Sequence, residues 1–547
     1  MSEAAVNIAA ALKTRALERP DATAVVVPHA KGGPVSLSYA DLDHESDRIA
    51  RGLRAIGITR GTRTALMVPP GIDLFPLVFG VFKAGVVPVM IDPGIGPKHL
   101  KKCLAEAKPE AFIGIPLAQA ARVILGWGRG SVKTVVTAGR RLFWGGYTLD
   151  QVKRKGDDVD WNALAETRAD ELAAILFTSG STGPPKGVVY THGAFTAQVE
   201  LIREMYDIRP GEVDLPTFPL FALFDPALGM TTIVPDMDPT RPAEADPNKI
   251  LGAIQRYEVT CMFGSPALLD TVGRYGAEEQ VKLPSLKRVI SAGAPVPPHV
   301  MRTFCRMLED DARVVTPYGA TEALPVASVS SHEVLDGTEH LTAEGAGVCV
   351  GSVVPPNIVR IIPIHEDPIE RWDESVCLPA GEIGEIVVKG PTVTSSYDAR
   401  EQATLQAKIA DGDAVRHRMG DLGYFDGEGR LWFCGRKAHR VKTSEGDLFT
   451  VPIEQVFNVH EDVKRSALVG LGAGDEREPA LVIELTAEGK RRPKADVLKE
   501  LEALGAACAK TTMVKRFFFH PGLPVDIRHN AKINRPLLSE WATKEAS

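Results

Sequence analysis

Cysteine is sparse in this chain, and the few cysteines present form no recognisable pairs. The 547 residues contain seven, at positions 103, 261, 305, 349, 377, 434 and 508, and none belongs to a CxxC motif. Cysteines scattered in this way argue against a disulfide framework and against a zinc site. They predict reduced thiols, and therefore a cytoplasmic protein.

Long hydrophobic runs and long basic tracts are also scarce. The longest apolar stretch, residues 74–91, is interrupted by Pro76, Lys83 and Pro88, and no basic segment followed by an apolar one begins the chain. We therefore expect neither a membrane span nor a signal peptide. The net charge is −7, and the short basic run Lys490–Arg492 is typical of a solvated loop, so we expect no nucleic-acid partner.

What the chain does contain is a regular alternation of apolar strands and helices. Thr64–Val68, Ile72–Lys83 and Val86–Ile91 have the pattern of a strand, a helix and a strand, and a similar unit follows at residues 100–115. Such alternation predicts an α/β fold with doubly wound parallel sheets. A chain of 547 residues is also long enough for at least two domains.

The N-terminal segment predicts two helices. Residues 4–17 carry apolar side chains at helical spacing, which favours an amphipathic helix. Ser38 follows a short extended segment and precedes a second such pattern. We expect its hydroxyl to cap that helix.

The most informative stretch is Phe177–Gly187, with the sequence FTSGSTGPPKG, which lies between two apolar runs. Its glycines permit tight turns and expose backbone amides, while four hydroxyls and Lys186 add donors and one positive charge. Together these groups suit a polyphosphate. The segment is not a GxxxxGK[ST] loop, because its lysine precedes the last glycine and a strand follows. A plain surface turn is the alternative explanation.

This loop resembles the phosphate loop of the adenylate-forming superfamily, which includes acyl-CoA synthetases, luciferases and the adenylation domains of peptide synthetases. Two later segments, RVISAGAP from Arg288 and VVTPYGATE from Val314, stand in the order of that family's nucleotide site. The resemblance covers the whole chain and implies that ATP and Mg²⁺ are used to activate a carboxylate. It implies that Tyr318 stacks on the purine, that Thr321 reaches a phosphate and that Glu322 binds the metal.

The resemblance also divides the chain into two domains. Residues 345–435 are rich in short strands with Gly and Pro turns, which predicts a small β-barrel at the end of an N-terminal domain of residues 1–435. Residues 436–547 are expected to form a smaller, mobile α+β lid. The resemblance places Asp421 on the ribose hydroxyls and Arg436 at the domain junction. It makes Lys532 the lid lysine that bridges the carboxylate and the α-phosphate.

The predicted site therefore consists of two overlapping groups and one metal ligand. Lys532, Lys186, Glu322 and Thr321 are expected to act in catalysis, and Glu322 is the expected ligand of Mg²⁺. The expected nucleotide-binding residues are Thr178, Ser179, Gly180, Ser181, Thr182, Gly183, Lys186, Gly293, Ala294, Pro295, Tyr318, Gly319, Ala320, Thr321, Asp421, Arg436 and Lys532.

Several segments are similar to one branch of the superfamily, the β-lactone synthetases of bacterial long-chain olefin biosynthesis: DLPTFPLFALFDPALG, PDMDPTRPAEADP, SPALL, GYFDGEGRLWFCGRK and PVDIRHNAKI. The resemblance implies a long-chain 2-alkyl-3-hydroxy acid whose own β-hydroxyl displaces AMP. Ala222 stands where the CoA ligases commonly have histidine, and Lys437–Arg440 contains none of the acidic residues that they carry after the hinge. Asp225 and His192 are the candidate bases for the β-hydroxyl.

Other functions remain open at this stage. An acyl-CoA synthetase would perform the same first half-reaction, and a non-catalytic nucleotide-binding scaffold subunit would need none of the charged site residues. The apolar segment Leu215–Asp238 favours the wall of an acyl pocket, although an ordinary core would have a similar composition. The resemblance further implies partners to look for: the reductase and β-lactone decarboxylase of olefin biosynthesis, and a second copy of the chain.

Overall fold

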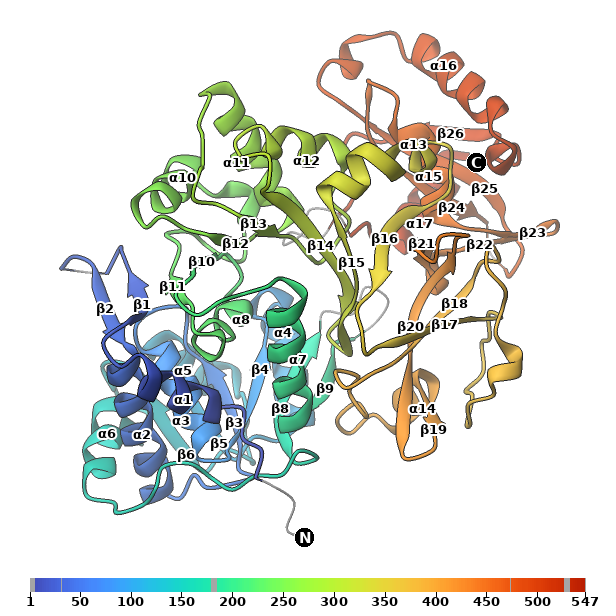
Figure 1. Ribbon diagram of the computed structural model, residues 1–547. Helices are drawn as coiled ribbons and strands as arrows, with labels where there is room; N and C mark the ends of the chain where they lie inside the picture. The colour runs from blue at the N-terminus through green and yellow to red at the C-terminus, as the bar shows by residue number, and fades with distance from the viewer. Residues whose placement is uncertain (1–4, 31, 179–183, 473, 526–531, 547) are drawn as a thin grey trace.

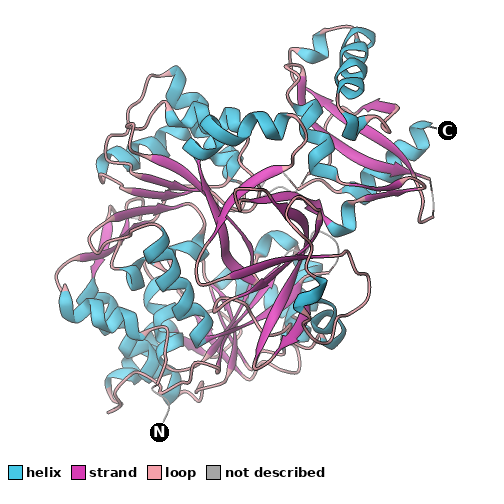
Figure 2. Ribbon diagram, turned by 45° about the vertical axis from the view of Figure 1, so that its right-hand side comes forward, coloured by secondary structure: helices cyan, strands magenta, loops and turns pink. Residues whose placement is uncertain are grey.

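The computed structural model describes residues 5–30, 32–178, 184–472, 474–525 and 532–546. Its strands form two large sheets, a three-stranded sheet and a two-stranded hairpin. Helices flank the strands on both sides (Figure 2). The C-terminal elements, red in Figure 1, lie together at the upper right, away from the blue N-terminal ones. This arrangement confirms the predicted α/β fold.

The first sheet contains the predicted βαβ units. Its seven strands lie in the order β7-β6-β5-β3-β4-β8-β9, and all neighbours are parallel except β8 and β9. The strands are β3 (Arg63–Met67), β4 (Val87–Ile91), β5 (Ala111–Gly114), β6 (Thr134–Thr137), β7 (Tyr147–Thr148), β8 (Leu172–Thr178) and β9 (Lys186–Thr191). The associated helices are α2 (Tyr39–Ala55), α3 (Leu74–Lys83), α4 (Pro97–Ala107), α5 (Pro116–Leu125), α6 (Leu149–Asp157) and α7 (His192–Met205).

The second sheet has 14 strands and passes from a half that is parallel except at its outer edge pair into an antiparallel half. The first half consists of β1 (Thr23–Val27), β2 (Val35–Ser38), β10 (Val213–Pro216), β11 (Thr231–Ile233), β12 (Cys261–Phe263), β13 (Arg288–Ile290) and β14 (Arg313–Ala320). The second half consists of β15 (Ala323–Ser330), β16 (Val348–Val353), β17 (Ile358–Ile362), β18 (Gly384–Lys389), β19 (Lys408–Asp411), β20 (Ala414–Phe425) and β21 (Leu431–Arg436). The strands predicted as a small barrel therefore continue the larger sheet through β15 and β16.

The helices that accompany the second sheet are short or moderate in length: α8 (Pro219–Ala222), α9 (Asp225–Leu228), α10 (Pro247–Arg256), α11 (Pro266–Glu278), α12 (Pro298–Cys305), α13 (Glu339–Ala343) and α14 (Glu401–Ala407). Buried side chains of α10, α11 and α12 pack with those of β10 to β14 in one apolar cluster. Among the described helices, none has both the length and the apolar character needed to cross a membrane.

The C-terminal part is smaller and mixed. The hairpin of β22 (Val441–Thr443) and β23 (Gly446–Leu448) precedes a three-stranded sheet of β24 (Val463–Leu471), β25 (Glu478–Leu485) and β26 (Arg516–Phe519). Its helices are α15 (Thr450–Asn458), α16 (Lys494–Ala507) and α17 (Arg535–Ala546). Two apolar clusters lie among these elements, which gives this part a core of its own.

The first helix is shorter than the sequence pattern predicts. Helix α1 covers Ala10–Glu18, whereas we expected residues 4–17. Asn7 accounts for the late start, because its amide nitrogen donates to the carbonyl oxygens of Phe82 (3.0 Å) and Ala165 (3.1 Å). Its side-chain oxygen accepts from the backbone of Ala9 at 2.9 Å. These bonds hold the segment against the body of the protein and begin the helix only afterwards.

The second helix begins as predicted, with a capping box. The Ser38 hydroxyl accepts from the backbone N–H of Asp41 at 3.0 Å, and the Asp41 carboxylate accepts from the backbone N–H of Ser38 at 3.1 Å. Each side chain thus satisfies a backbone donor that the helix leaves unpaired.

We expect Ser38→Ala to lower the free energy of unfolding by about 1 kcal/mol, because the alanine cannot accept the Asp41 N–H. Urea denaturation followed by circular dichroism measures the change. Ser352→Ala, at an exposed serine in β16, is the matched control and should leave the midpoint unchanged. Equal midpoints for the two variants would show that the capping box adds nothing to stability.

Candidate active site

A tight turn between β14 and β15 carries two of the predicted catalytic residues. Ala320 pairs with Ala323, so Thr321 and Glu322 form a two-residue hairpin turn. Glycine is required just before it, since a Cβ atom on Gly319 would lie 2.6 Å from the carbonyl oxygen of Ala323. The turn therefore presents the hydroxyl of Thr321 and the carboxylate of Glu322 together at the tip of a rigid hairpin.

Residues from distant segments hold this turn in place. The Tyr190 hydroxyl, on β9, donates to the carbonyl oxygen of Thr321. The backbone N–H of Thr394 donates to the carbonyl oxygen of Glu322 at 2.9 Å. The Tyr397 hydroxyl donates to Oε1 of Glu322 at 2.6 Å. Within the described part of the chain, Oε2 of Glu322 has no hydrogen-bond partner. A carboxylate that is fixed through one oxygen, with the other oxygen available, is suited to bind a divalent metal ion.

Lys186 lies on the other side of Tyr397. It begins β9, and its Nζ is 4.9 Å from the centroid of the Tyr397 ring, a cation–π contact. Tyr397 thus contacts both the predicted metal ligand and the predicted phosphate-binding cation. Lys186 pairs in register with Thr178 at the end of β8. The predictions for Ser179, Gly180, Ser181, Thr182 and Gly183 concern residues outside the described ranges.

Asp421 and Arg436 face each other on neighbouring strands, β20 and β21. Arg436 Nε lies 3.0 Å from Asp421 Oδ1, and the Tyr318 hydroxyl donates to Asp421 Oδ2 at 2.8 Å. Burial raises the pKa of Asp421, while Arg436 and Tyr318 act in the opposite direction. Although Oδ1 is close to Arg436, it has no hydrogen bond of good geometry among the described residues. A buried carboxylate oxygen without a hydrogen-bond donor is suited to accept a hydrogen bond from a sugar hydroxyl.

The loop predicted to approach the purine follows β13. The parallel pair β13–β14 and the bond from Ser291 N–H to the carbonyl oxygen of Val315 (2.9 Å) place residues 293–295 at the edge of the sheet that also carries Tyr318. Gly293 has φ of +97°, a conformation that favours glycine. The loops at the carboxyl ends of neighbouring parallel strands are where α/β sheets bind ligands.

Lys532 comes to this cluster from the C-terminal part of the chain. Its charge lowers the pKa of Asp421, which shows that the two residues lie within electrostatic range. Three residues later, Arg535 donates to both oxygens of the buried Glu454, at 2.6 and 3.0 Å. This bidentate pair fixes the segment that follows Lys532 onto helix α15.

The junction at residue 436 is fastened by basic side chains that reach back to the preceding sheet. Lys437 Nζ donates to the carbonyl oxygen of His365 at 2.7 Å and lies 3.3 Å from Oε1 of the buried Glu385. Arg440 Nη2 donates to Oε1 of Glu366 at 2.5 Å. Further along, Lys510 Nζ donates to the carbonyl oxygen of Gly345 at 2.6 Å. Arg440 Nε also donates to Asp447 Oδ2 at 2.6 Å, so the acidic partners of the junction lie on both sides of it.

Three functional side chains were missed at the sequence level: Tyr397, Thr394 and Lys408. Lys408 is buried on β19 and donates to the Thr394 hydroxyl at 3.2 Å. Burial lowers the pKa of Lys408 to about 7, and the charge of Glu322 opposes that shift. All three lie more than 70 residues from Glu322, so no local spacing marks them.

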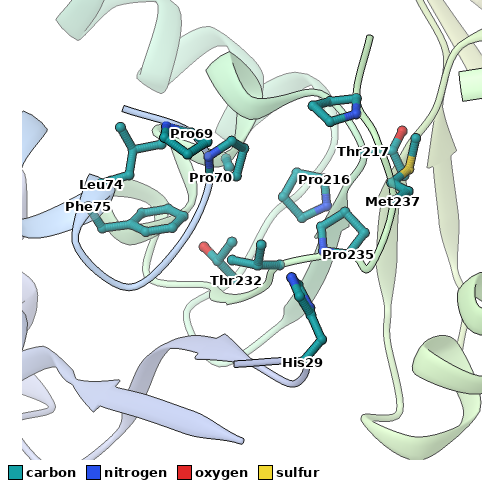
Figure 3. A pocket seen from close by; sticks show the side chains of 13 residues that line it. His29, Pro69, Pro70, Leu74, Phe75, Pro216, Thr217, Thr232, Pro235 and Met237 are labelled. Atoms are coloured by element: carbon teal, nitrogen blue, oxygen red, sulfur yellow. The ribbon is translucent and has the colours of Figure 1, made fainter. Parts of the chain in front are cut away.

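A pocket adjoins the sheet edge near α8 and α9. It has a volume of about 140 Å³, and most of its wall is apolar. In Figure 3, Phe75, Pro216 and Pro235 surround a common space, and His29 points toward it from a separate segment. Ala222 also lines it. The predicted apolar segment Leu215–Asp238 therefore contributes much of this wall.

Both candidate bases, Asp225 and His192, are buried and hydrogen-bonded within the protein. Asp225 is 3 % exposed and accepts a hydrogen bond from Thr232, a pocket residue, at 2.9 Å. Burial, together with the neighbouring Asp214, raises the pKa of Asp225 well above its usual range. His192 begins α7, and its Nδ1 accepts from the backbone N–H of Ile8 at 3.3 Å. Burial lowers the pKa of His192 to about 4.

A sequence comparison shows the family of the chain. A family model for AMP-binding enzymes matches residues 12–398. The chain belongs to this family. Curated relatives match almost its whole length, which extends the likeness beyond the matched region.

Two curated relatives are identical to this chain at more than half of the aligned positions. The olefin beta-lactone synthetase of Xanthomonas campestris pv. campestris is 53 % identical over 550 residues, covering 98 % of each chain. The olefin beta-lactone synthetase of Stenotrophomonas maltophilia is 52 % identical over 554 residues, again covering 98 % of each chain. Among solved structures, the amide bond synthetase McbA of Marinactinospora thermotolerans has the same fold, with a TM-score of 0.79, 23 % identity and coverage of 98 % of this chain and 99 % of that one.

We expect Tyr397→Phe to weaken magnesium-dependent ATP binding about ten-fold, because Glu322 loses a hydrogen bond to its charged carboxylate. Titrations of ATP with and without Mg²⁺ measure the effect, and the loss should vanish when the metal is omitted. Tyr424→Phe removes a comparable hydroxyl, bonded to the carbonyl oxygen of Ala346 at 3.0 Å, and serves as the control. An equal loss in both variants, or in both titrations, would contradict the role of Tyr397.

Proposed function

We propose that this protein is an ATP-dependent β-lactone synthetase that takes a long-chain 2-alkyl-3-hydroxyalkanoic acid. It converts the acid into a β-lactone and releases AMP and pyrophosphate. The observation that carries the proposal is 53 % identity over 98 % of both chains to the Xanthomonas olefin beta-lactone synthetase. Solved structures below 25 % identity support only the fold.

In the first step a carboxylate oxygen of the acid attacks the α-phosphorus of ATP, and pyrophosphate leaves. Negative charge grows on the phosphate oxygens, so catalysis depends mainly on positioning and positive charge. Lys186 and Lys532 supply that charge, Asp421 and Arg436 orient the ribose, and Thr321 contacts a phosphate. Glu322 would hold Mg²⁺, which when bound neutralises phosphate charge.

In the second step the β-hydroxyl oxygen attacks the acyl carbon of the same molecule. The new C–O bond closes a four-membered ring, the bond between the acyl carbon and the phosphate oxygen breaks, and AMP leaves with the electron pair while the hydroxyl proton is released. Because the nucleophile is tethered next to the acyl carbon, its effective concentration is very high. The apolar pocket beside Ala222 is the place we assign to the alkyl chains.

We assign the mobile lid to residues 436–547 and the ATP- and acyl-binding domain to residues 1–435. All seven cysteines are free thiols, which supports a cytoplasmic location. An assembly with the reductase and the β-lactone decarboxylase of olefin biosynthesis, and a homo-oligomer, remain predictions.

We expect Lys532→Ala to slow adenylation by about 10²–10³-fold while ATP binding persists, because the charge acts mainly on the developing transition state. Pyrophosphate release measures the first quantity and nucleotide titration the second. Lys544→Ala, in α17, is the control for loss of a lysine from the C-terminal part. Release of pyrophosphate at the unmodified rate would remove Lys532 from the mechanism.

The function is tested by incubating the protein with ATP and a 2-alkyl-3-hydroxy acid, with and without CoA. We expect AMP, pyrophosphate and a product lighter than the acid by one water, identified by mass spectrometry and NMR, and no effect of CoA. A plain fatty acid has no β-hydroxyl and should stop at the adenylate. Consumption of CoA with accumulation of a thioester from the plain acid would show an acyl-CoA synthetase instead. Absence of pyrophosphate release from either acid would indicate a nucleotide-binding subunit.

A further inference from the structure

One region of this acidic chain is strongly basic. Residues 98–141 contain nine Lys and Arg residues and two Glu residues, which gives this segment a net charge of +7 in a chain whose total is −7. The basic residues are Lys98, Lys101, Lys102, Lys108, Arg122, Arg129, Lys133, Arg140 and Arg141. All of them except Arg122 are exposed. The rest of the chain therefore carries −14.

These cations are not neutralised within the protein. In the described part of the chain, only Lys133 forms an ion pair, with Glu110 at 2.8 Å. The other acidic residue of the segment, Glu106, is paired with Arg400 from outside it, at 2.6 Å. Both carboxylates are thus already committed. The remaining positive charge faces solvent and is available to an external anion.

Large apolar side chains are exposed in the same segment. Leu117, Ile124 and Phe143 are 75 %, 77 % and 76 % exposed. Leu117 and Ile124 are seven residues apart on α5 and therefore share one face of that helix. Val123, Leu125 and Leu142 are exposed as well. Exposed apolar residues grouped in this way mark an interaction site.

The basic and apolar residues lie together on one surface. Lys101 and Lys108 line a groove with Arg122, Ile124 and Arg129. At the other end of α5, a Cβ atom on Gly139 would lie 3.6 Å from Pro116, so the loop carrying Leu142 and Phe143 is next to the helix start. We call this surface, formed by α4, α5 and residues 126–143, the basic-apolar face.

We propose that the basic-apolar face binds the surface of an anionic lipid bilayer. A peripheral membrane site needs apolar side chains that enter the headgroup boundary and Lys or Arg residues that meet acidic headgroups, and both are present here. A protein interface of ordinary composition is instead depleted of lysine at its core. None of the groove residues lines the apolar pocket beside Ala222, so the proposed membrane site and that pocket share no lining residue.

The proposal is tested without ATP or substrate, so its outcome is independent of the proposed function. The intact protein is mixed with phosphatidylcholine vesicles prepared with or without phosphatidylglycerol, and bound protein is separated by flotation. We expect binding only to the acidic vesicles, with a decrease when NaCl is raised. Binding to neither kind of vesicle, or equally to both, would overturn the proposal.

Variants separate the two components of the face. Lys101→Glu with Lys102→Glu should weaken vesicle binding about ten-fold or more by charge reversal. Ile124→Ser with Phe143→Ser should weaken it while preserving the dependence on acidic lipid. Lys515→Glu and Leu537→Ser, at exposed positions of the C-terminal part, are the matched controls and should bind as the unmodified protein does.

Circular dichroism melting checks that each variant is folded, and all the substituted side chains are exposed, so we expect unchanged midpoints. Sedimentation velocity distinguishes the rival occupant. If the protein forms an oligomer that Ile124→Ser with Phe143→Ser dissociates, and no vesicle binding is seen, the face is a contact between copies and the proposal is wrong. Vesicle binding that the controls lose as much as the face variants do would overturn it as well.

Discussion

The two-residue turn of Thr321 and Glu322 is the constraint on which the rest of the site depends. A turn this short has no conformational freedom of its own, but it needs partners to fix its position relative to the other sheet. Tyr190 from the first sheet and Thr394 and Tyr397 from the segment after β18 supply them. Because those partners come from both sheets, the turn connects the two sheets. The positions of Thr321 and Glu322 follow from that single meeting point.

The charges around this turn are matched to an anionic ligand. Lys186, Arg436 and Lys532 are cations, and Glu322 and Asp421 are the carboxylates that face them. Asp421 is buried, and its ion pair with Arg436 spans two neighbouring strands, so neither charge is left alone in a region of low polarity. A polyphosphate with a bound cation would complete this balance, since the site by itself has more positive than negative groups.

Local patterns predicted the local features well. Ser38 caps α2 through the expected bond. The roles of Lys532 and Asp421 came from a family resemblance, because more than 100 residues separate them and no spacing rule connects them. Tyr397 was missed for the same physical reason: its hydroxyl bonds Glu322 across a separation of 75 residues. The basic-apolar face was missed because a whole-chain charge averages a positive region with a more negative remainder.

The fastening of the junction at residue 436 has a consequence for the reaction cycle. Rotation of the C-terminal part would pull Arg440 from Glu366 and Lys510 from Gly345, and would take a cation from the buried Glu385. These contacts weight the equilibrium toward the conformation in which the charge of Lys532 reaches Asp421. In a β-lactone synthetase the second nucleophile is the β-hydroxyl of the acid that is already bound. No further reactant has to enter between the two steps. A single conformation of the C-terminal part can then serve both steps. That part has to move away only when substrate enters and product leaves.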